Sequence, residues 1–220
     1  MIIEDKHIYI YGERQKAASL VIVNTFQGSG SEVYSAIEKM AEKRFTLAVV
    51  SDIDWDDEMS PWECPALYKD DTHFSGGADI YLDKLTKSII PAITGELGAE
   101  PEKIIIAGYS LAGLFAIYSL YRTGLFSAAV SASGSMWFPG FMEFTDNNNF
   151  IKRPEKVYFS LGDREAKTKN LLLSTVESIT AQIYEKFKNM EIDTVFEKNP
   201  GNHFKEADIR LAKGIAWVLQ

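Results

Sequence analysis

Hydrophobic positions along the chain follow two alternating patterns. Short runs rich in β-branched residues predict strands at 7–11, 20–25, 46–51, 103–109, 128–131, 157–161 and 194–197. Apolar residues at three- and four-residue steps predict helices at 32–43, 79–97, 172–190 and 205–219. Pro91 is expected to break the second of these helices. Together the patterns predict an α/β fold, with about seven strands in a mostly parallel sheet and helices on both faces.

Two long segments, 52–77 and 132–154, match neither pattern. Irregular segments of this length in a compact domain are usually functional or disordered, and both of these contain tryptophan and proline. We therefore expect ordered walls that border a pocket. The length of 220 residues suits one domain over residues 1–220, without a large lid domain.

Composition and charge narrow the class of protein. Hydrophobic residues at 46% and charged residues at 25% are ordinary globular values. A net charge of -8 opposes binding to phosphate backbones, so no nucleic-acid partner is expected. Cys64 is the sole cysteine, which excludes an internal disulfide and a cysteine-based zinc cluster. Residues 1–12 lack the long apolar core of a signal peptide, and a cytoplasmic location is expected.

Residues 104–121, IIIAGYSLAGLFAIYSLY, form an uncharged stretch that just reaches the length of a membrane-spanning helix. The β-branched residues 104–106 favour a strand that is buried on both faces. GYSLAG follows at 108–113, and residues 114–121 continue as a helix that is apolar nearly all round. We therefore predict a strand, a sharp turn and a buried helix, with no membrane partner. A membrane-anchored scaffold is the alternative, and it rests on this stretch alone.

The turn in this stretch places one hydroxyl side chain, Ser110, between small residues. In a nucleophile elbow of the pattern G-x-S-x-G, small neighbours at minus two and plus two let the strand and the helix approach closely. Gly108 and Ala112 take these positions. The elbow would aim the amide of Leu111, at the helix N-terminus, toward a developing oxyanion. The alternative is a glycine-rich packing turn that holds an ordinary serine.

A nucleophilic serine needs an adjacent base, and in this motif the chain order is serine, acid, histidine. His203 is the one histidine that follows Ser110, and it lies between the last predicted strand and the last predicted helix. The segment GDREAKTKN, after the strand at 157–161, offers Glu165 as the acid, with Asp163 as the alternative. The alternative for His203, Glu165 and Asp163 is that each is an ordinary residue of a surface loop.

The second oxyanion donor is expected in the loop after an earlier strand, within NTFQGSGSE. We predict the backbone amide of Gln27, with that of Phe26 as the alternative. Candidate walls of a substrate pocket are the aromatic residues of the two irregular segments, Trp55, Trp62, Trp137 and Phe138. For each of these the alternative is packing of the loops onto the sheet.

An acidic segment after the third predicted strand matches the ligand spacing of a calcium-binding loop at Asp52, Asp54, Asp56, Ser60 and Glu63. However, Asp57 occupies the position where the loop needs glycine, and a strand leads into the segment where a helix is required. We therefore predict a solvated acidic loop, and we expect neither a metal nor an organic cofactor.

Four motifs carry a resemblance to a known family: GYSLAG around Ser110, SGSMWFPGF at 133–141, YFSLGDRE ending at Glu165, and GNHF around His203. They resemble the putative-esterase branch of the α/β-hydrolases, which includes esterase D and the enterochelin esterases. The resemblance covers about the C-terminal half, since the N-terminal strands match in order only. It implies an α/β-hydrolase fold and an acyl-enzyme, and by position it gives Ser110, Glu165 and His203 the triad roles. The branch often has a His-Gly or Asp-Gly pair in its oxyanion loop, where this chain has Phe26-Gln27-Gly28.

These observations predict a serine-dependent, carboxylesterase-like hydrolase that cleaves a small-molecule ester or thioester. An acyltransferase with the same triad and a non-catalytic binding module that retains the fold are the alternatives. A base and an acid in the required chain order favour the enzyme over the binding module. No pattern in the sequence indicates an oligomeric state.

Overall fold

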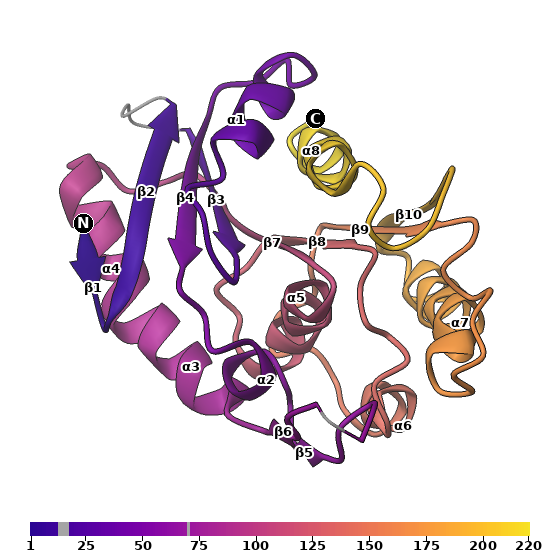
Figure 1. Ribbon diagram of the computed structural model, residues 1–220. Coiled ribbons are helices and arrows are strands. Elements are labelled where there is room, and N and C mark those ends of the chain that lie inside the picture. The colour runs from indigo at the N-terminus through magenta and orange to yellow at the C-terminus, as the bar shows by residue number, and fades with distance from the viewer. Residues whose placement is uncertain (13–17, 70) are drawn as a thin grey trace.

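The computed structural model describes residues 1–12, 18–69 and 71–220. Its centre is an eight-stranded sheet with the order β1-β2-β4-β3-β7-β8-β9-β10 (Figure 1). The strands are β1 (Ile2–Ile3), β2 (Lys6–Gly12), β3 (Ser19–Asn24), β4 (Phe45–Ser51), β7 (Ile104–Tyr109), β8 (Ala128–Ala132), β9 (Lys156–Gly162) and β10 (Asp193–Asn199). The pairs β1–β2 and β2–β4 are antiparallel, and all pairs from β4 to β10 are parallel. The predicted mostly parallel sheet is confirmed.

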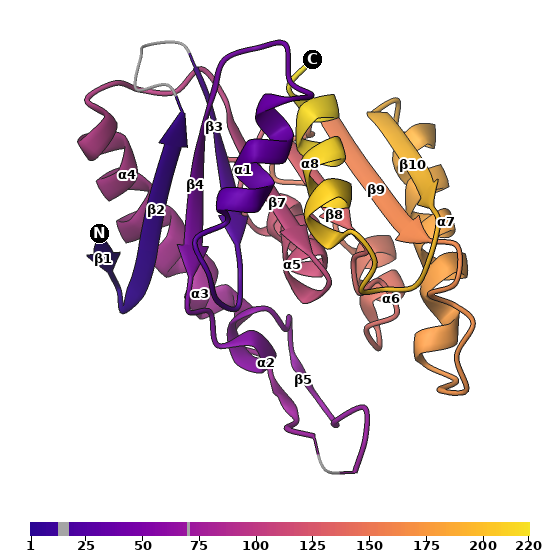
Figure 2. The same cartoon turned by 45° about the horizontal axis from the view of Figure 1, so that its top comes forward.

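Helices cover both faces of this sheet (Figure 2). One face carries α1 (Ser31–Glu38) and α8 (Ala207–Val218), and the other carries α3 (Ala78–Lys84), α4 (Ile90–Leu97), α5 (Leu111–Arg122) and α7 (Val176–Asn189). Alternate residues of the central strands point to opposite faces: Val21 and Val23 pack toward α1 and α8, while Leu20 and Ile22 pack toward the other helices. Burial on both faces explains why the strand sequences are continuous hydrophobic runs.

The uncharged stretch 104–121 divides into two buried elements. β7 ends at Tyr109, α5 begins at Leu111, and Ser110 lies between them. Every residue of α5 from Leu111 to Tyr121 is buried, which explains the lack of charge on any face of this helix. In the part of the chain that the structure describes, no helix is long and apolar enough to cross a membrane.

The two segments predicted to be irregular contain short regular elements. Segment 52–77 holds α2 (Trp55–Glu58) and a hairpin of β5 (Glu63–Cys64) with β6 (Phe74–Ser75); its residue 70 lies outside the described residues. Segment 132–154 holds α6 (Phe141–Asn147). Each element is shorter than the window over which a hydrophobic period can be recognised, so the sequence pattern does not predict it. Within the described residues, neither segment forms a large lid domain.

The helix predicted at 79–97 does not break at Pro91. Its backbone stays helical through α3, a π-helical turn, η1 (Leu85–Ile89), and α4. Pro91 has no N–H to donate, and the π turn directly before it accommodates the change of hydrogen-bond register. The helix predicted at 172–190 is observed as a 3-10 turn, η2 (Leu173–Thr175), that continues into α7 (Val176–Asn189).

Candidate active site

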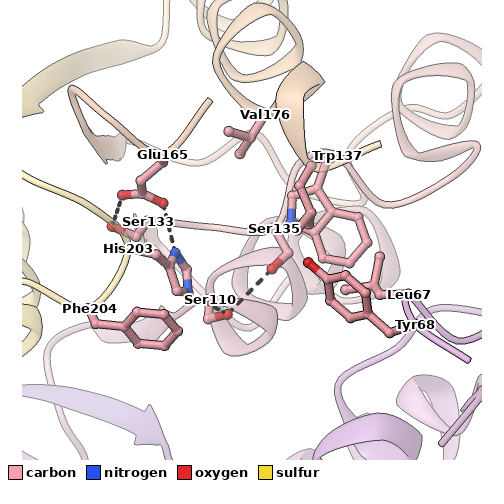
Figure 3. Close-up of a pocket in the computed structure, with 11 residues that line it drawn as sticks. Leu67, Tyr68, Ser110, Ser133, Ser135, Trp137, Glu165, Val176, His203 and Phe204 are labelled. Atoms are coloured by element: carbon pink, nitrogen blue, oxygen red, sulfur yellow. Dashed lines mark hydrogen bonds and ion pairs between the residues drawn. The ribbon is translucent and has the colours of Figure 1, made fainter. Parts of the chain in front are cut away.

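Three loops at the carboxyl ends of parallel strands bring Ser110, Glu165 and His203 together (Figure 3). They follow β7, β9 and β10, and these ends meet at one edge of the sheet. His203 Nε2 lies 3.1 Å from Ser110 Oγ, although 93 positions separate the two residues. His203 Nδ1 lies 2.7 Å from Glu165 Oε2, across 38 positions. The three side chains therefore form a hydrogen-bonded series from a carboxylate, through an imidazole, to a hydroxyl.

Ser110 has a backbone conformation that residues other than glycine rarely adopt, with φ 59° and ψ −123°. Its surroundings hold it there. Its amide donates to the Ala132 carbonyl at 3.1 Å, and its own carbonyl accepts from the amides of Gly113, Leu114 and Ser135 at 3.0, 3.1 and 3.1 Å. This sharp turn between strand and helix directs the hydroxyl toward His203.

Gly108 and Ala112 allow the strand and the helix to approach closely at this turn. A Cβ atom placed on Gly108 would lie 2.2 Å from the backbone carbon and oxygen of Ala112 and 2.7 Å from its side chain. No side chain larger than hydrogen fits at position 108 without moving the helix. Ala112, in the second small position, is fully buried.

Glu165 is held by donors on both of its oxygens. Oε2 faces His203, and Oε1 accepts from the Gly162 amide at 2.5 Å, from Ser133 Oγ at 2.7 Å and from Arg210 Nη1 at 3.1 Å. Burial raises the pKa of the Glu165 carboxyl, but hydrogen bonds from His203, Gly162 and Ser133 outweigh that effect, so the pKa lies below its usual value. The group is therefore ionised at neutral pH.

Asp163, the alternative acid, points elsewhere. Its side chain is exposed, and Oδ1 accepts from the Gly201 amide at 2.8 Å, which lowers the pKa of the carboxyl. This bond ties the loop after β9 to the turn before His203. Of the two carboxylates that the sequence leaves open, the structure brings Glu165 against the histidine.

The two predicted oxyanion amides lie in different surroundings. Leu111 is the first residue of α5, where backbone N–H groups have no partner within the helix. Gln27 and Phe26 follow β3 on an exposed loop, where the Gln27 carbonyl accepts from Thr25 Oγ1 at 3.1 Å. Gln27 and Phe26 line a hollow together with Trp55 and Tyr109. Tyr109 is the residue directly before Ser110 in the chain.

Residues 23–203 match the family described as Putative esterase. The chain belongs to this family. The match begins within β3 and ends at His203, so it includes all three residues of the hydrogen-bonded series.

The chain is also similar to a relative and to solved structures. The uncharacterized protein YbbA of Bacillus subtilis is 24% identical over 170 residues, which span 74% of this chain and 68% of YbbA. The crystal structure of an IroE-like serine hydrolase from Shewanella oneidensis matches with a TM-score of 0.82 and 16% identity, over 97% of this chain and 75% of that one. The enterobactin esterase FES from Shigella flexneri matches with a TM-score of 0.69 and 14% identity, over 97% of this chain and 54% of that one. The protein is an esterase-type hydrolase with the α/β-hydrolase fold.

A cavity of about 320 Å³ opens in front of Ser110 in this esterase. Apolar and aromatic side chains form most of its wall: Leu67, Tyr68, Trp137, Leu173, Val176 and Phe204. Figure 3 shows Trp137, Tyr68 and Leu67 on one side of Ser110, with Phe204 on the other. Tyr68 and Phe204 are exposed, at 54% and 84%, so they form the rim, whereas Trp137 is buried at 7%.

Of the four aromatic residues predicted as pocket walls, Trp137 lines this cavity. Trp62 and Phe138 instead pack with each other in an aromatic cluster, and Trp62 Nε1 donates to the Pro139 carbonyl at 2.9 Å. Trp55 packs edge-on against Phe26 beside the separate hollow near Gln27. Trp62 and Phe138 therefore have a packing role, as in the alternative, but the rings that they contact belong to the loop segments and not to the sheet, since Trp62 also packs on Phe141 and Phe144.

Three further residues at the site are absent from the sequence prediction: Ser133, Ser135 and Arg210. Ser135 is buried, and its Oγ lies 3.5 Å from Ser110 Oγ. Ser133 and Ser135 both belong to the SGSMWFPGF motif, so this motif is the sequence signal that indicates them. Arg210 lies on the buried face of α8, one turn before Gly214. The sequence signal for Arg210 is a cation on the otherwise apolar face of a predicted helix.

The acidic segment after β4 has other partners. Asp52 pairs with His7, Asp56 accepts from Thr72, and Ser60 donates to the Asp56 and Asp57 carbonyls at 2.7 and 3.1 Å. Within the described ranges, no three histidine, cysteine, aspartate or glutamate side chains are grouped so as to hold a metal ion.

Proposed function

We propose that this chain is a serine-dependent carboxylesterase that cleaves a small-molecule ester or thioester through an acyl-enzyme. The observation that carries the proposal is the series of contacts from Glu165 to His203 at 2.7 Å and from His203 to Ser110 at 3.1 Å. A serine hydroxyl becomes nucleophilic when an adjacent base takes its proton and a third group orients that base.

In the proposed reaction, Ser110 Oγ attacks the carbonyl carbon of the substrate while its proton passes to His203 Nε2. The tetrahedral intermediate collapses, the bond to the alcohol or thiol breaks, and His203 returns the proton to the leaving group. Water then attacks the acyl-enzyme by the same path and releases the acid. Glu165 stays ionised throughout and stabilises the imidazolium, which its lowered pKa supports.

The developing negative charge on the carbonyl oxygen would be stabilised by backbone amides. The amide of Leu111, at the N-terminus of α5, is the first donor of the proposal. The amide of Gln27 is the second, with that of Phe26 as the alternative, since both lie on the loop after β3 beside the elbow residue Tyr109.

The substrate class follows from the chemistry of the cavity. The described residues that line it include no lysine or arginine, and Glu165 is its one carboxylate. A volume near 320 Å³ is at the small end of ligand sites, which run from about 300 Å³ upward. We infer that the site takes a compact, uncharged acyl group. FES has been solved in the presence of enterobactin, so a siderophore ester belongs in the test panel.

The proposal predicts covalent labelling of one serine. One equivalent of a fluorophosphonate should abolish hydrolysis of p-nitrophenyl butyrate, and mass spectrometry should locate the adduct on Ser110. An adduct on another residue, or full activity after complete labelling, would contradict the assignment. Absence of both labelling and turnover, across simple esters, thioesters and enterobactin, would favour the binding module.

The cavity also predicts discrimination by charge. The anionic p-nitrophenyl hemisuccinate should be cleaved with a kcat/KM at least about tenfold below that of p-nitrophenyl butyrate, because its carboxylate would be desolvated near Glu165 without a cationic partner. The two acyl chains are similar in length, so each serves as the size control for the other. Equal rates for both esters would show that the charged end stays in water and that the cavity does not select against charge.

A further inference from the structure

Arg210 is a cation buried beside the proposed triad. Its residue is 1% exposed, and it comes from α8, the helix that follows His203. Burying a guanidinium is costly unless it is paired and hydrogen-bonded. A charge on the apolar face of a helix therefore calls for an explanation from its contacts.

Those contacts reach the carboxyl ends of four neighbouring parallel strands at this edge of the sheet. Nη1 donates to Glu165 Oε1 at 3.1 Å, to Ser133 Oγ at 3.1 Å and to Tyr109 Oη at 3.3 Å. Nη2 donates to the Pro200 carbonyl at 3.1 Å. These partners follow or end β9, β8, β7 and β10, so one side chain connects the segments that carry Ser110, Glu165 and His203.

Two of the partners extend this network to His203 and Glu165. Tyr109 Oη donates to the His203 carbonyl at 2.5 Å, and burial raises the pKa of the Tyr109 phenol, so the proton for this bond is retained. Ser133 Oγ donates to Glu165 Oε1 at 2.7 Å. Ser133 has a positive φ of 46°, which places its hydroxyl at a strained turn after β8.

Space around the guanidinium is also restricted. A Cβ atom on Gly162 would lie 3.0 Å from both Nη1 and Nη2, and 2.3 Å from the Gly201 carbonyl oxygen. The glycine thus lets the loops after β9 and β10 close around the side chain. A guanidinium held in this way presents its donors in fixed directions.

We propose that Arg210 is a positioning residue for the esterase reaction: it fixes the Glu165 carboxylate and the loop of His203 in their reactive arrangement. Three donors occupy Oε1, which leaves Oε2 as the acceptor for His203 Nδ1. The nearby positive charge also favours the ionised carboxylate over the protonated form. This inference rests on the proposed function.

Replacing Arg210 with methionine should lower kcat by about 100-fold, the cost of a small misplacement of reacting groups, with KM nearly unchanged because Arg210 does not line the cavity. The acidic limb of kcat/KM should move to higher pH. The charged or titratable groups that face Glu165 are His203, Arg210 and Tyr109. Without this cation the ionised form of Glu165 is less favoured, so the carboxylate takes up a proton at higher pH.

The matched control is Lys213→Met, on the same helix. Lys213 pairs with Glu197 at 2.7 Å and has no contact with the three proposed triad residues, so kcat and the acidic limb should match the unmodified enzyme. Since Arg210→Met leaves Glu165 without its cation and can impair folding, Arg210→Lys and Ser133→Ala serve as further variants. Each should remain folded by circular dichroism and lose kcat, with Ser133→Ala the milder. KM should stay nearly unchanged in Arg210→Lys, whereas Ser133 lines the cavity, so Ser133→Ala is compared by kcat alone.

The activity of the unmodified enzyme distinguishes failure of the proposed function from failure of the positioning role. If it neither hydrolyses esters nor reacts with a fluorophosphonate, the proposed function fails. If it is active, and the folded Arg210 variants keep kcat within about threefold and the same acidic limb, the positioning role is wrong. If Arg210→Met does not fold, Arg210→Lys and Ser133→Ala decide: unchanged kcat in both overturns the proposal, and a selective loss of kcat supports it.

Discussion

Replacement of Ser110 by alanine is expected to lower ester turnover by about 10⁴- to 10⁶-fold, on the scale seen when a triad nucleophile is removed. The variant should also lose fluorophosphonate labelling. Alanine has the same restriction at φ 59° as serine, so the strained turn should persist and the thermal unfolding midpoint should change little. The measurement is kcat/KM for p-nitrophenyl butyrate, beside a thermal melt.

Ser135→Ala is the matched control for this experiment. Ser135 Oγ lies 3.5 Å from Ser110 Oγ, but in the described structure its side chain has no contact with His203. Labelling at Ser110 should therefore survive the Ser135 substitution. Persistent labelling and turnover in Ser110→Ala would remove Ser110 from the nucleophile's role and would direct the search to Ser135.

Glu165→Gln should lower kcat by about 10⁴-fold, while Asp163→Asn should leave it within a few-fold. An amide in place of the carboxylate cannot stabilise the imidazolium, and it favours the wrong tautomer of the histidine. Asparagine at position 163 retains a carbonyl oxygen for the Gly201 amide, so the turn before His203 keeps its bond. Kinetics of the two variants with one neutral ester provide the comparison.

The pair is informative because the two carboxylates are neighbours in the chain with different partners. Both carry a pKa below the usual value, Asp163 through the Gly201 amide and Glu165 through several donors that outweigh its burial. A large loss in Asp163→Asn with a nearly silent Glu165→Gln would reverse the roles. Equal, moderate losses would instead point to a shared effect on the His203 loop.

Local sequence signals account for much of what could be predicted. Continuous apolar runs predict strands that are buried on both faces, and the parallel sheet with helices on both sides is confirmed. GYSLAG predicts a strand, a turn and a helix because its small residues let the strand and the helix approach closely. The structure shows this close approach between Gly108 and Ala112. The chain order of the motif then limits the candidate base to His203. Each of these inferences uses residues that are close in sequence, or a rule about order.

The tertiary structure was needed wherever distant segments meet. Asp163 and Glu165 are two residues apart, so no sequence period separates them, and the fold of the loop alone turns Glu165 toward His203. Trp62 and Trp137 have the same local character, yet one lies in an aromatic cluster and the other lines the cavity. The contacts of Arg210 with Tyr109, Ser133 and Glu165 span 101, 77 and 45 positions. Local sterics and burial are written in the sequence, which is why it predicts the long strands and helices and the chain order of the candidate triad residues. The partners of side chains on different loops depend on where the sheet brings those loops, so they could be read from the tertiary structure alone.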